Sequence, residues 1–482
     1  MSVSQLEPTA LWQHFAALNA VPRPSKKEDR IIAFMKAFGD NLGLETLVDK
    51  TGNVIIKKPA SPGMEHKQTV ILQSHLDMVH QKNAETQFDF DTQGIEMYID
   101  GDWVKANGTT LGADNGIGVA AIMAILSSND IPHPALEAFF TIDEETGMTG
   151  AKEMESQLLS GTVLLNLDTE DDDELSVGCA GGIDTNTFYT YKEVDTNPTD
   201  TCFQISIKGL LGGHSGMDID KGRGNANKWM ARILWELQLV QQIHLHEFDG
   251  GSLRNAIPRE ASATVSCSNP GLFEQTIASI ISDFKNEFKS IEPYFEIKAE
   301  VRTCPAQMMD AADFNKILRT LCNVHNGVFR MSPEISGLVE ASSSLARVII
   351  KNKEFLTQSL QRSSVESTKK EVSMTIRCAF ENMGAKVEQS GDYPGWQPNM
   401  SSPILQTMTT LYRQLFNEEP KVKACHAGLE CGLLGEKLPG VDMISFGPNI
   451  RAAHSPDEMV QISSVQKFWQ FYLASLQQIP NR

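Results

Sequence analysis

The chain has 482 residues, 41% hydrophobic and 21% charged, which are ordinary proportions for a globular protein. Its formal net charge of −19 argues against a nucleic-acid partner, because phosphate backbones are bound by clustered cations. No stretch is long and apolar enough to span a membrane, and the N-terminus lacks the pattern of a secretory signal. We therefore expect a cytoplasmic protein of more than one domain, with neither membrane nor nucleic acid as partner.

The eight cysteines form no Cys-x-x-Cys pair. They stand at positions 179, 202, 267, 304, 322, 378, 425 and 431. This scatter favours reduced thiols in a cytoplasmic protein over a disulfide framework or a structural zinc site.

The first part of the chain predicts helices that alternate with strands. Helices are expected at 9–18, 27–43, 116–126 and 150–159, and strands at 45–57 (two, joined by a turn), 69–75, 136–142 and 162–167. Such alternation implies βαβ units and a largely parallel sheet. Ligands of such sheets collect at the carboxyl ends of the strands.

The predicted strand that begins at Thr69 is apolar and leads into His75 and Asp77, which are the first candidate site residues. Side chains two residues apart on a strand leave the same face. An imidazole placed in this way can bind a metal, while the carboxylate accepts a hydrogen bond from its second ring nitrogen. Taken alone, the pair is also typical of an ordinary polar strand end.

Further acidic residues follow other predicted strands. Glu144 and Glu145 follow the strand that ends at Ile142, and Asp168 follows the strand 163–167. Asp114 lies in the glycine-rich loop 110–118, just before a predicted helix. That loop lacks the lysine of a P-loop and the Gly-x-Gly-x-x-Gly spacing, which argues against a nucleotide.

A histidine in a loop rich in proline and glycine completes the set of donors. His454 follows a predicted strand at 443–446. The five candidate ligands are His75, Asp114, Glu145, Asp168 and His454. Two imidazoles and three carboxylates suit a pair of zinc-like ions with one bridging carboxylate. Such a pair lowers the pKa of a shared water and polarises a carbonyl, and Glu144 is the natural general base.

These residues carry a resemblance to a known family. The chain resembles the co-catalytic zinc peptidases of family M20 in the motifs His75-x-Asp77, Gly112-Ala-Asp114-Asn-Gly, Asp143-Glu-Glu145, Asn166-Leu-Asp168 and Ala453-His454-Ser-Pro-Asp-Glu. It further resembles the bacterial members that cleave Xaa-His dipeptides such as carnosine. The motifs are Gly212-Gly-His214-Ser-Gly, Gly222-Arg-Gly-Asn-Ala-Asn-Lys, Leu253-Arg-Asn-Ala-Ile-Pro-Arg-Glu, Tyr393-Pro-Gly-Trp-Gln-Pro and His426-Ala-Gly-Leu-Glu-Cys-Gly. The matches extend from near residue 12 to near residue 475.

The resemblance implies a role for each motif residue. It makes Asp114 the bridge, His75 and Asp168 ligands of opposite metals, Glu145 and His454 the completing ligands, Asp77 the partner of His75, and Glu144 the general base. It implies two Zn²⁺ per subunit, with Co²⁺ or Mn²⁺ as substitutes. It also implies a cis peptide bond between Asp114 and Asn115.

The fold that the resemblance implies is α/β. Residues 1–181 and 396–482 would form a zinc-peptidase-like catalytic domain with a mixed, mainly parallel sheet flanked by helices. Residues 182–395 would form an inserted α+β lid or dimerisation domain of a homodimer.

Substrate contacts are expected from the inserted domain and the last segment. The resemblance brings His214 to the oxyanion, from its own or the partner subunit, and assigns substrate contacts to Asn255 and Gly428. Arg362 has the planar fork that pairs with a peptide carboxylate, although a surface arginine fits its position equally well. Glu430 could face a substrate amino group.

The expected activity is hydrolysis of Xaa-His dipeptides by metal-activated water with a glutamate base. A tripeptidase or an N-acyl amino acid deacylase shares the metal core and stays open as an alternative. A dimeric binding protein that keeps its metals without turnover is a further alternative, which the intact Glu144 disfavours.

Overall fold

The computed structural model describes residues 2–482 and separates into two compact units. The first unit runs to Gly178 and resumes with Pro398–Ala424 and Leu429–Arg482. The second unit comprises Cys179–Gln397 and Cys425–Gly428. The domain boundaries expected after residues 181 and 395 lie close to these breaks, but Cys425–Gly428 joins the second unit.

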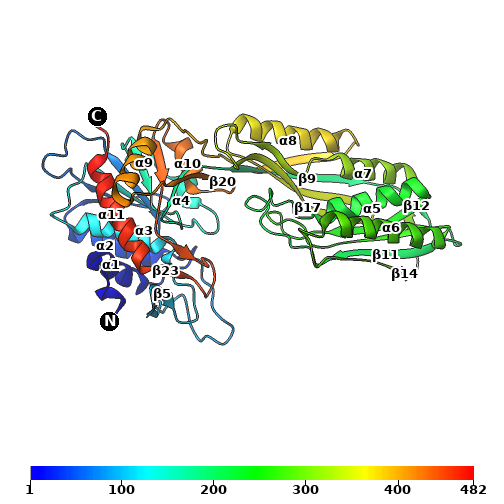
Figure 1. Cartoon of the computed structure of the whole chain (residues 1–482), viewed down its shortest axis with the longest axis horizontal. Helices are drawn as coiled ribbons and strands as arrows, with labels where there is room; N and C mark the ends of the chain where they lie inside the picture. Colours follow the sequence, from blue (N-terminus) through cyan, green and yellow to red (C-terminus); the bar gives the residue numbers. More distant parts are fainter. Residues whose placement is uncertain (1) are drawn as a thin grey trace. The chain divides into compact units, whose positions relative to one another are not determined.

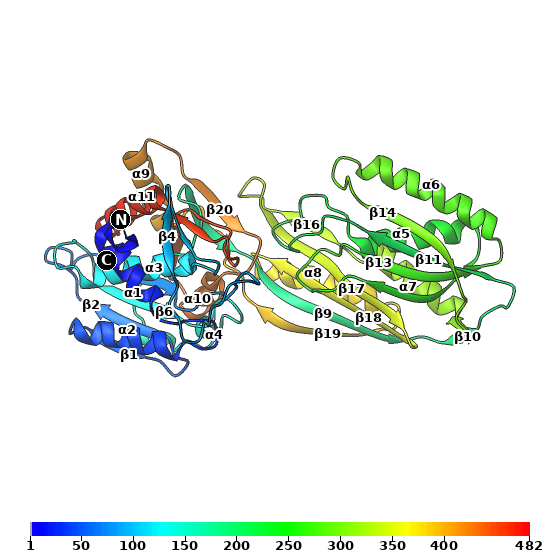
Figure 2. The same ribbon diagram turned by 90° about the horizontal axis from the view of Figure 1, so that it is seen from below.

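The first unit contains an eight-stranded sheet in the order β1-β2-β6-β3-β7-β21-β8-β20 (Figures 1 and 2). Its strands are β1 (Glu45–Val48), β2 (Val54–Lys58), β3 (Val70–His75), β6 (Leu136–Thr141), β7 (Val163–Asn166), β8 (Glu174–Cys179), β20 (Lys421–Cys425) and β21 (Asp442–Ser445). The four central strands β6, β3, β7 and β21 pair in parallel, and β1-β2, β2-β6 and β21-β8 pair antiparallel.

The sheet is therefore mixed, as predicted, and its parallel strands form the centre. The outer part differs because β1 and β2 are joined by a tight turn, and such a connection makes neighbours antiparallel. β21 comes from the last segment of the chain and completes the parallel centre beside β7.

Helices flank this sheet, and one of them carries a predicted site residue (Figure 1). They are η1 (Val3–Gln5), α1 (Thr9–Asn19), α2 (Asp29–Asn41), α3 (Ala113–Ser127), α4 (Thr149–Glu153), η2 (Ser156–Leu158), α9 (Pro403–Phe416), α10 (Glu430–Lys437) and α11 (Ile462–Gln478). α3 is apolar all round and buried against α1 and β3, which is the pattern of a core helix. The helix predicted at 150–159 is two short pieces, because the buried Met154 has an extended backbone.

A small sheet in the order β22-β23-β5-β4 lies in the same unit. Its strands are β4 (Met97–Asp100), β5 (Trp103–Ala106), β22 (Ile450–Arg451) and β23 (Met459–Gln461). β22 and β23 pair antiparallel and hold both ends of the loop that carries His454. No helix among residues 2–482 combines the length and apolar character that crossing a membrane requires.

The second unit is built on an antiparallel nine-stranded sheet in the order β14-β11-β13-β12-β17-β18-β9-β19, with β16 paired to β17. Its strands are β9 (Gly181–Thr190), β11 (Thr201–Lys208), β12 (Ile243–Gly250), β13 (Ala261–Cys267), β14 (Glu296–Arg302), β16 (Gly327–Met331), β17 (Val339–Lys351), β18 (Glu354–Ser363) and β19 (Lys386–Tyr393); β10 (Glu193–Asp195) and β15 (Gln307–Met309) form a separate pair. Its helices are α5 (Ala226–Val240), α6 (Pro270–Phe288), α7 (Ala311–Asn323) and α8 (Glu366–Glu381).

These helices pack on one face of the sheet through a single apolar core that includes Trp229, Phe273 and Phe355 (Figure 1). The opposite face carries polar and charged side chains on β11 to β14. An antiparallel sheet commonly has one face packed on a core and the other exposed to water.

Cys202 and Cys304 form a disulfide in this unit, so the prediction that the thiols are reduced is wrong for this pair. β11 and β14 pair antiparallel with Cys202 opposite Arg302, which brings Cys304 within reach, at a Cα–Cα distance of 5.2 Å. The two cysteines are 102 residues apart in the sequence. Their pairing depends on a strand register that cysteine spacing does not reveal.

Candidate metal centre

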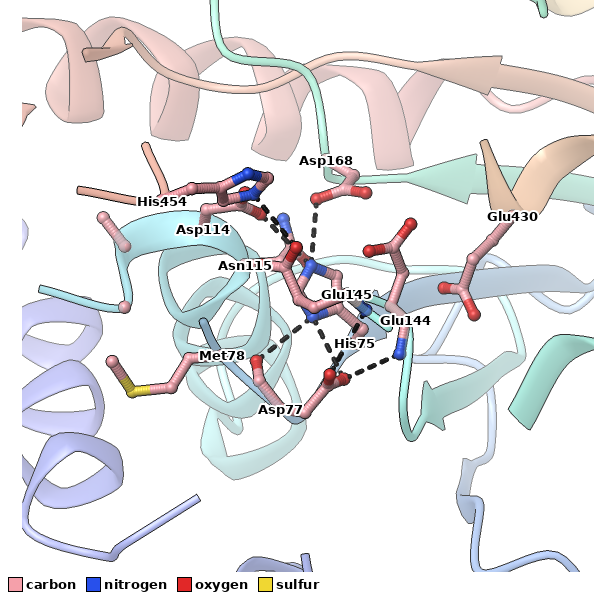
Figure 3. A network of polar contacts seen from close by, with 12 residues as sticks. His75, Asp77, Met78, Asp114, Asn115, Glu144, Glu145, Asp168, Glu430 and His454 are labelled. Atoms are coloured by element: carbon pink, nitrogen blue, oxygen red, sulfur yellow. Dashed lines mark hydrogen bonds and ion pairs between the residues drawn. The ribbon is translucent and has the colours of Figure 1, made fainter. Parts of the chain in front are cut away.

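The predicted ligands gather where the central strands of the first unit end (Figure 3). His75 is the last residue of β3, Asp168 follows β7, and Glu145 follows β6. Asp114 is the second residue of α3, and His454 lies in the loop between β22 and β23. All five belong to one compact unit, although nearly 400 residues separate the first from the last.

Asp114 lies between the two imidazoles. Its Oδ1 is 3.1 Å from His75 Nε2, and its Oδ2 is 3.2 Å from His454 Nε2. Asp168 Oδ1 is 3.6 Å from His75 Nε2, and Glu145 Oε2 is 2.9 Å from His454 Nε2. The side chains thus form two sets, each with an imidazole and a carboxylate, and both sets share Asp114.

In each set the donor atoms lie within 4.8 Å of one another. The sets are His75, Asp114 and Asp168, and Asp114, Glu145 and His454. This grouping differs from the one that the resemblance implied, because His75 and Asp168 fall on the same side of Asp114. The reason is geometric: β3 and β7 are neighbouring parallel strands, so their carboxyl ends lie side by side.

The chemistry of the donors fits a pair of divalent cations. Hydrogen bonds from His454 to Asp114 and Glu145 raise the pKa of His454 to about 11. Burial raises the pKa of Asp168 well above its usual value, because few positive groups offset its charge. Glu145 Oε1 is buried without a hydrogen-bond partner among the described residues, as expected for an oxygen that completes a metal shell.

Glu144 is half-buried and lies beside the candidate ligands (Figure 3). Burial, together with the nearby charges of Glu430, Glu145 and Asp114, raises the pKa of Glu144 to about 8. A carboxyl group with a pKa near neutrality can both take up and return a proton at physiological pH.

Asp77 contacts the turn at Glu144 and Glu145 as well as its predicted partner His75. Its carboxylate lies 3.4 Å from His75 Nδ1, and it accepts hydrogen bonds from the backbone N–H groups of Glu144 and Glu145 at 3.0 and 3.3 Å. Ser25 Oγ donates to it at 2.8 Å. One fully buried carboxylate therefore orients a metal ligand and the turn that carries the candidate base.

Comparison with known proteins shows the family of the chain. The model of peptidase family M20/M25/M40 matches residues 71–478, most of the chain. The chain belongs to this family. It is 39% identical, over 99% of both chains, to the cytosol non-specific dipeptidase of Escherichia coli.

Solved structures of the family show the same fold. The aminoacylhistidine dipeptidase of Vibrio alginolyticus matches with a TM-score of 0.95 and 42% identity, covering 100% of this chain and 99% of that one. An aminopeptidase of Bacillus cereus matches with a TM-score of 0.57 and 16% identity over 98% of this chain and 99% of that one, which shows a shared fold alone.

The peptide bond between Asp114 and Asn115 is cis, as the family resemblance implied. Asn115 Nδ2 donates to the carbonyl of Leu167 at 2.6 Å, just before the ligand Asp168. His454 itself has a backbone φ of +64°, which is uncommon outside glycine and is typical of functional loops.

Sequence reasoning missed Glu458, which holds the Asp114 loop to the His454 loop. Its buried carboxylate accepts hydrogen bonds from four successive backbone N–H groups, those of residues 111, 112, 113 and 114, at 2.8 to 3.2 Å. Burial raises the pKa of Glu458 to about 6, against the effect of these amides. Its place in the motif that also contains His454 was the available signal.

Arg23 holds the same loop from the other side. Its guanidinium donates to the carbonyl of Gly112 at 2.6 Å and to the carbonyls of Leu76 and Asp77 at 3.1 Å. Gly112 has a φ of +68°, and a Cβ there would lie 2.5 Å from Arg23 Nη2, so this position requires glycine. Arg23 lies between two prolines in the sequence, a context that suggests a surface turn.

The four predicted substrate contacts lie in the second unit. Arg362 is 5% exposed and donates to the hydroxyl of Tyr393 at 2.9 Å, so the alternative of a surface arginine is wrong. Its Nη2 lies 3.5 Å from His214 Nε2. Gly428 lies against the Tyr393 ring, since a Cβ there would be 3.1 Å from Tyr393 Cε2. The backbone carbonyl of Asn255 accepts a hydrogen bond from the N–H of Ser215, next to His214, at 2.8 Å.

The protonation of His214 follows from its contacts. Burial and the nearby Arg362 lower its pKa, so the ring is neutral at pH 7. Its Nδ1 accepts hydrogen bonds from the backbone N–H groups of Gly216 and Met217 at 3.2 and 3.0 Å. The proton of the neutral ring therefore lies on Nε2, which makes that atom a donor.

We expect Glu458→Gln to weaken zinc binding by about 10- to 100-fold, as substitutions behind metal ligands do. An amide cannot accept four backbone N–H groups, so the Asp114 carboxylate would lose its fixed position. Chelator competition measures the affinity, and the neighbouring exposed Asp457→Asn is the control. Unchanged zinc affinity in Glu458→Gln would contradict the role of Glu458.

Metal binding should release protons at pH 7. In the metal-free protein the pKa of His454 is raised to about 11, and Asp168, Asp114 and Asp77 raise that of His75 despite its burial. Both rings are therefore charged, whereas a metal binds the neutral imidazole. Calorimetric titration with zinc in buffers of different ionisation enthalpy should show this release, and the affinity should rise with pH. An observed enthalpy independent of the buffer would refute it.

Proposed function

We propose that this M20 peptidase is a dinuclear metallodipeptidase whose substrates are small dipeptides, including Xaa-His dipeptides such as carnosine. The observation that carries the proposal is Asp114 between two histidine–carboxylate sets, next to the half-buried Glu144. Two relatives that are 39% and 42% identical to this chain are both named as dipeptidases, one as a non-specific dipeptidase and the other as an aminoacylhistidine dipeptidase.

The metals would be held by the two sets that share Asp114. His75 and Asp168 would complete one site, and His454 and Glu145 the other. Nitrogen and carboxylate donors in this number suit Zn²⁺, with Co²⁺ or Mn²⁺ as substitutes. When bound, such ions polarise a peptide carbonyl and lower the pKa of a water molecule.

Glu144 is the proposed general base. The hydrogen bond from its backbone N–H to Asp77 fixes the start of the side chain, and partial burial shields its carboxyl group from bulk solvent. In its ionised form it would take the proton of the attacking water, and in its protonated form it would return that proton to the leaving amine.

Arg362 is proposed to bind the carboxylate of the dipeptide. Its guanidinium is buried, and its Nε has no hydrogen-bond partner among the described residues. A buried cation with an unsatisfied donor is costly until an anion reaches it. The neutral His214, with its proton on Nε2, is proposed to donate to the developing oxyanion.

We further propose the first unit as the catalytic domain and the second as the lid or dimerisation domain. A homodimer in the cytoplasm is the proposed form, supported by the cytosolic relative of Escherichia coli. We propose that Glu430 acts indirectly, from the side of the site away from the substrate. Gln73 and Thr141 each donate a hydrogen bond to its buried carboxylate at 2.7 Å.

Glu144→Gln should lower kcat for carnosine by about 10² to 10⁴-fold, because the amide cannot accept the proton of water. Bound zinc, measured by elemental analysis, should stay unchanged, since the donor atoms of both sets remain. The exposed Glu153→Gln on the same segment is the matched control. Near-normal turnover in Glu144→Gln would disprove the base assignment.

Arg362→Lys should raise KM for a dipeptide by about 10- to 100-fold with a smaller effect on kcat, because a two-bond contact to the carboxylate becomes a single one. The wild-type enzyme should discriminate against the same dipeptide with its carboxyl group amidated, and the variant should lose most of that discrimination. Arg347→Lys, on the neighbouring strand β17, is the control.

Assays of the same enzyme with Xaa-His dipeptides, other dipeptides, a tripeptide and an N-acetyl amino acid define the substrate class. Preferred cleavage of the N-acetyl compound or the tripeptide would replace the proposed dipeptidase by one of those alternatives.

A further inference from the structure

The disulfide between Cys202 and Cys304 lies in the second unit, and a histidine lies beside it. Cys202 on β11 is 1% exposed, whereas Cys304, two residues after the end of β14, is half-buried. His246 Nε2 lies 3.7 Å from Cys202 Sγ. A reagent from solvent therefore reaches this bond through the sulfur of Cys304.

A β-bulge on β12 places His246 at this position. Leu245 and Glu247 pair with consecutive residues of β13, so His246 is the extra residue between them, and such a bulge redirects a side chain. Its Nδ1 lies 2.8 Å from the carbonyl of Gln307, which can only accept a hydrogen bond, so Nδ1 carries the proton. Burial lowers the pKa of His246, so the ring is neutral at pH 7 and Nε2 is an acceptor beside Cys202.

Each sulfur of the disulfide lies near an acceptor that suits the reduced state. Opening the bond would produce two S–H groups, and buried donors need acceptors inside the protein. His246 Nε2 would accept from Cys202, and the carbonyl of Asp200, 3.5 Å from Cys304 Sγ, would accept from Cys304. A disulfide has no hydrogen to donate, so these two acceptors form hydrogen bonds with the sulfurs only after reduction.

The surrounding backbone holds the two sulfurs side by side without the covalent bond. The register of β11 with β14 places Cys202 opposite Arg302, just before Cys304. Beyond Cys304, the carbonyl of Ala306 accepts a hydrogen bond from the N–H of Thr196 at 3.0 Å, and β15 pairs with β10. Because both flanks of Cys304 are fixed in this way, an opened pair can close again within the folded protein.

We propose that Cys202, Cys304 and His246 form a reversible thiol–disulfide exchange site for small thiols of the glutathione class. In a cytoplasm that such thiols keep reducing, protein disulfides are usually transient. The two cysteines are 102 residues apart, and a bond that closes so long a loop stabilises the fold, so its state would set the stability of the second unit. The site contains no residue of the metal centre, so the proposed activity can fail without affecting this inference.

The bond opens in two exchange steps. A small thiolate attacks Cys304 Sγ, and the Cys202 sulfur leaves with the electron pair and takes up a proton from water. A second small thiolate attacks the small-molecule sulfur of the mixed disulfide, which releases Cys304 and the oxidised small disulfide. Two electrons thus pass from two small thiols to the protein, and their two protons end on the two cysteines.

Closure reverses these steps and uses the histidine. The small disulfide first forms a mixed disulfide with the thiolate of Cys304 and releases one small thiolate. His246 Nε2 then takes the proton of Cys202 while the Cys202 sulfur attacks Cys304 Sγ. The second small thiolate leaves and receives that proton.

Equilibration of the full-length protein in mixtures of reduced and oxidised glutathione tests the site, with alkylation and peptide mass spectrometry as the readout. Cys202 and Cys304 should change state together and reversibly while near-ultraviolet circular dichroism shows a folded protein, and the reduced form should unfold at a lower temperature. Cys378→Ser, at an exposed free cysteine, should not shift the balance. A bond that stays closed in a large excess of reduced glutathione, or that opens only as the protein unfolds, would overturn the proposal.

Variants test the role of each residue. Cys202→Ser should accumulate glutathione on Cys304, whereas in Cys304→Ser the buried Cys202 should stay unmodified. His246→Asn should slow closure at pH 7 by at least about tenfold, because the proton acceptor is lost, and higher pH should restore the rate. His244→Asn on the same strand is the control. A glutathione adduct on Cys202 in Cys304→Ser, or an unchanged closure rate in His246→Asn, would refute the assigned roles.

Discussion

The crowding of carboxylates around two imidazoles is the constraint on which the first unit depends. Like charges at hydrogen-bonding distances repel strongly when they are removed from water. Burial and this repulsion together raise the pKa of Glu144 to about 8 and that of Asp168 well above its usual value. Such an arrangement persists only if the surrounding structure holds it in place, and divalent cations are the natural compensation for the excess negative charge.

The fold holds the carboxylates mainly with backbone groups. Four amides converge on Glu458, two amides converge on Asp77, and Arg23 binds three carbonyls. The segment around Gly112 is thus fixed at its N–H groups by an anion and at a carbonyl by a cation. Burial lowers the pKa of Arg23 to about 10, and the charges of Glu458 and Asp77 offset part of that cost. Because Asp77 binds both His75 and the turn at Glu144, a candidate metal ligand and the proposed base are positioned by the same carboxylate.

The sequence predicted the site residues better than their supports, for a physical reason. Ligands need particular donor atoms, and strand ends of a parallel sheet converge, so His75, Asp114 and Asp168 could be inferred from residue type and position. Arg23 and Glu458 act on backbone groups, which leave no trace in the sequence of the segment they hold. The grouping of His75 with Asp168 required the order β3-β7, and the disulfide required the register of β11 with β14. The antiparallel outer part of the sheet includes β1 and β2, which are joined by the turn that was predicted within residues 45–57.

The carboxylate cluster of the first unit and the Arg362 guanidinium of the second unit are charged groups of opposite sign that lack full compensation. The cluster around Asp114 in the first unit contains more carboxylates than its two imidazoles can neutralise. This excess negative charge attracts cations. In the second unit, the buried Arg362 donates to the Tyr393 hydroxyl and lies beside the neutral His214, and its Nε has no hydrogen-bond partner among the described residues. A guanidinium in this state selects for an anion with two oxygens in one plane. A free carboxylate is such an anion, and this requirement is independent of the metal chemistry.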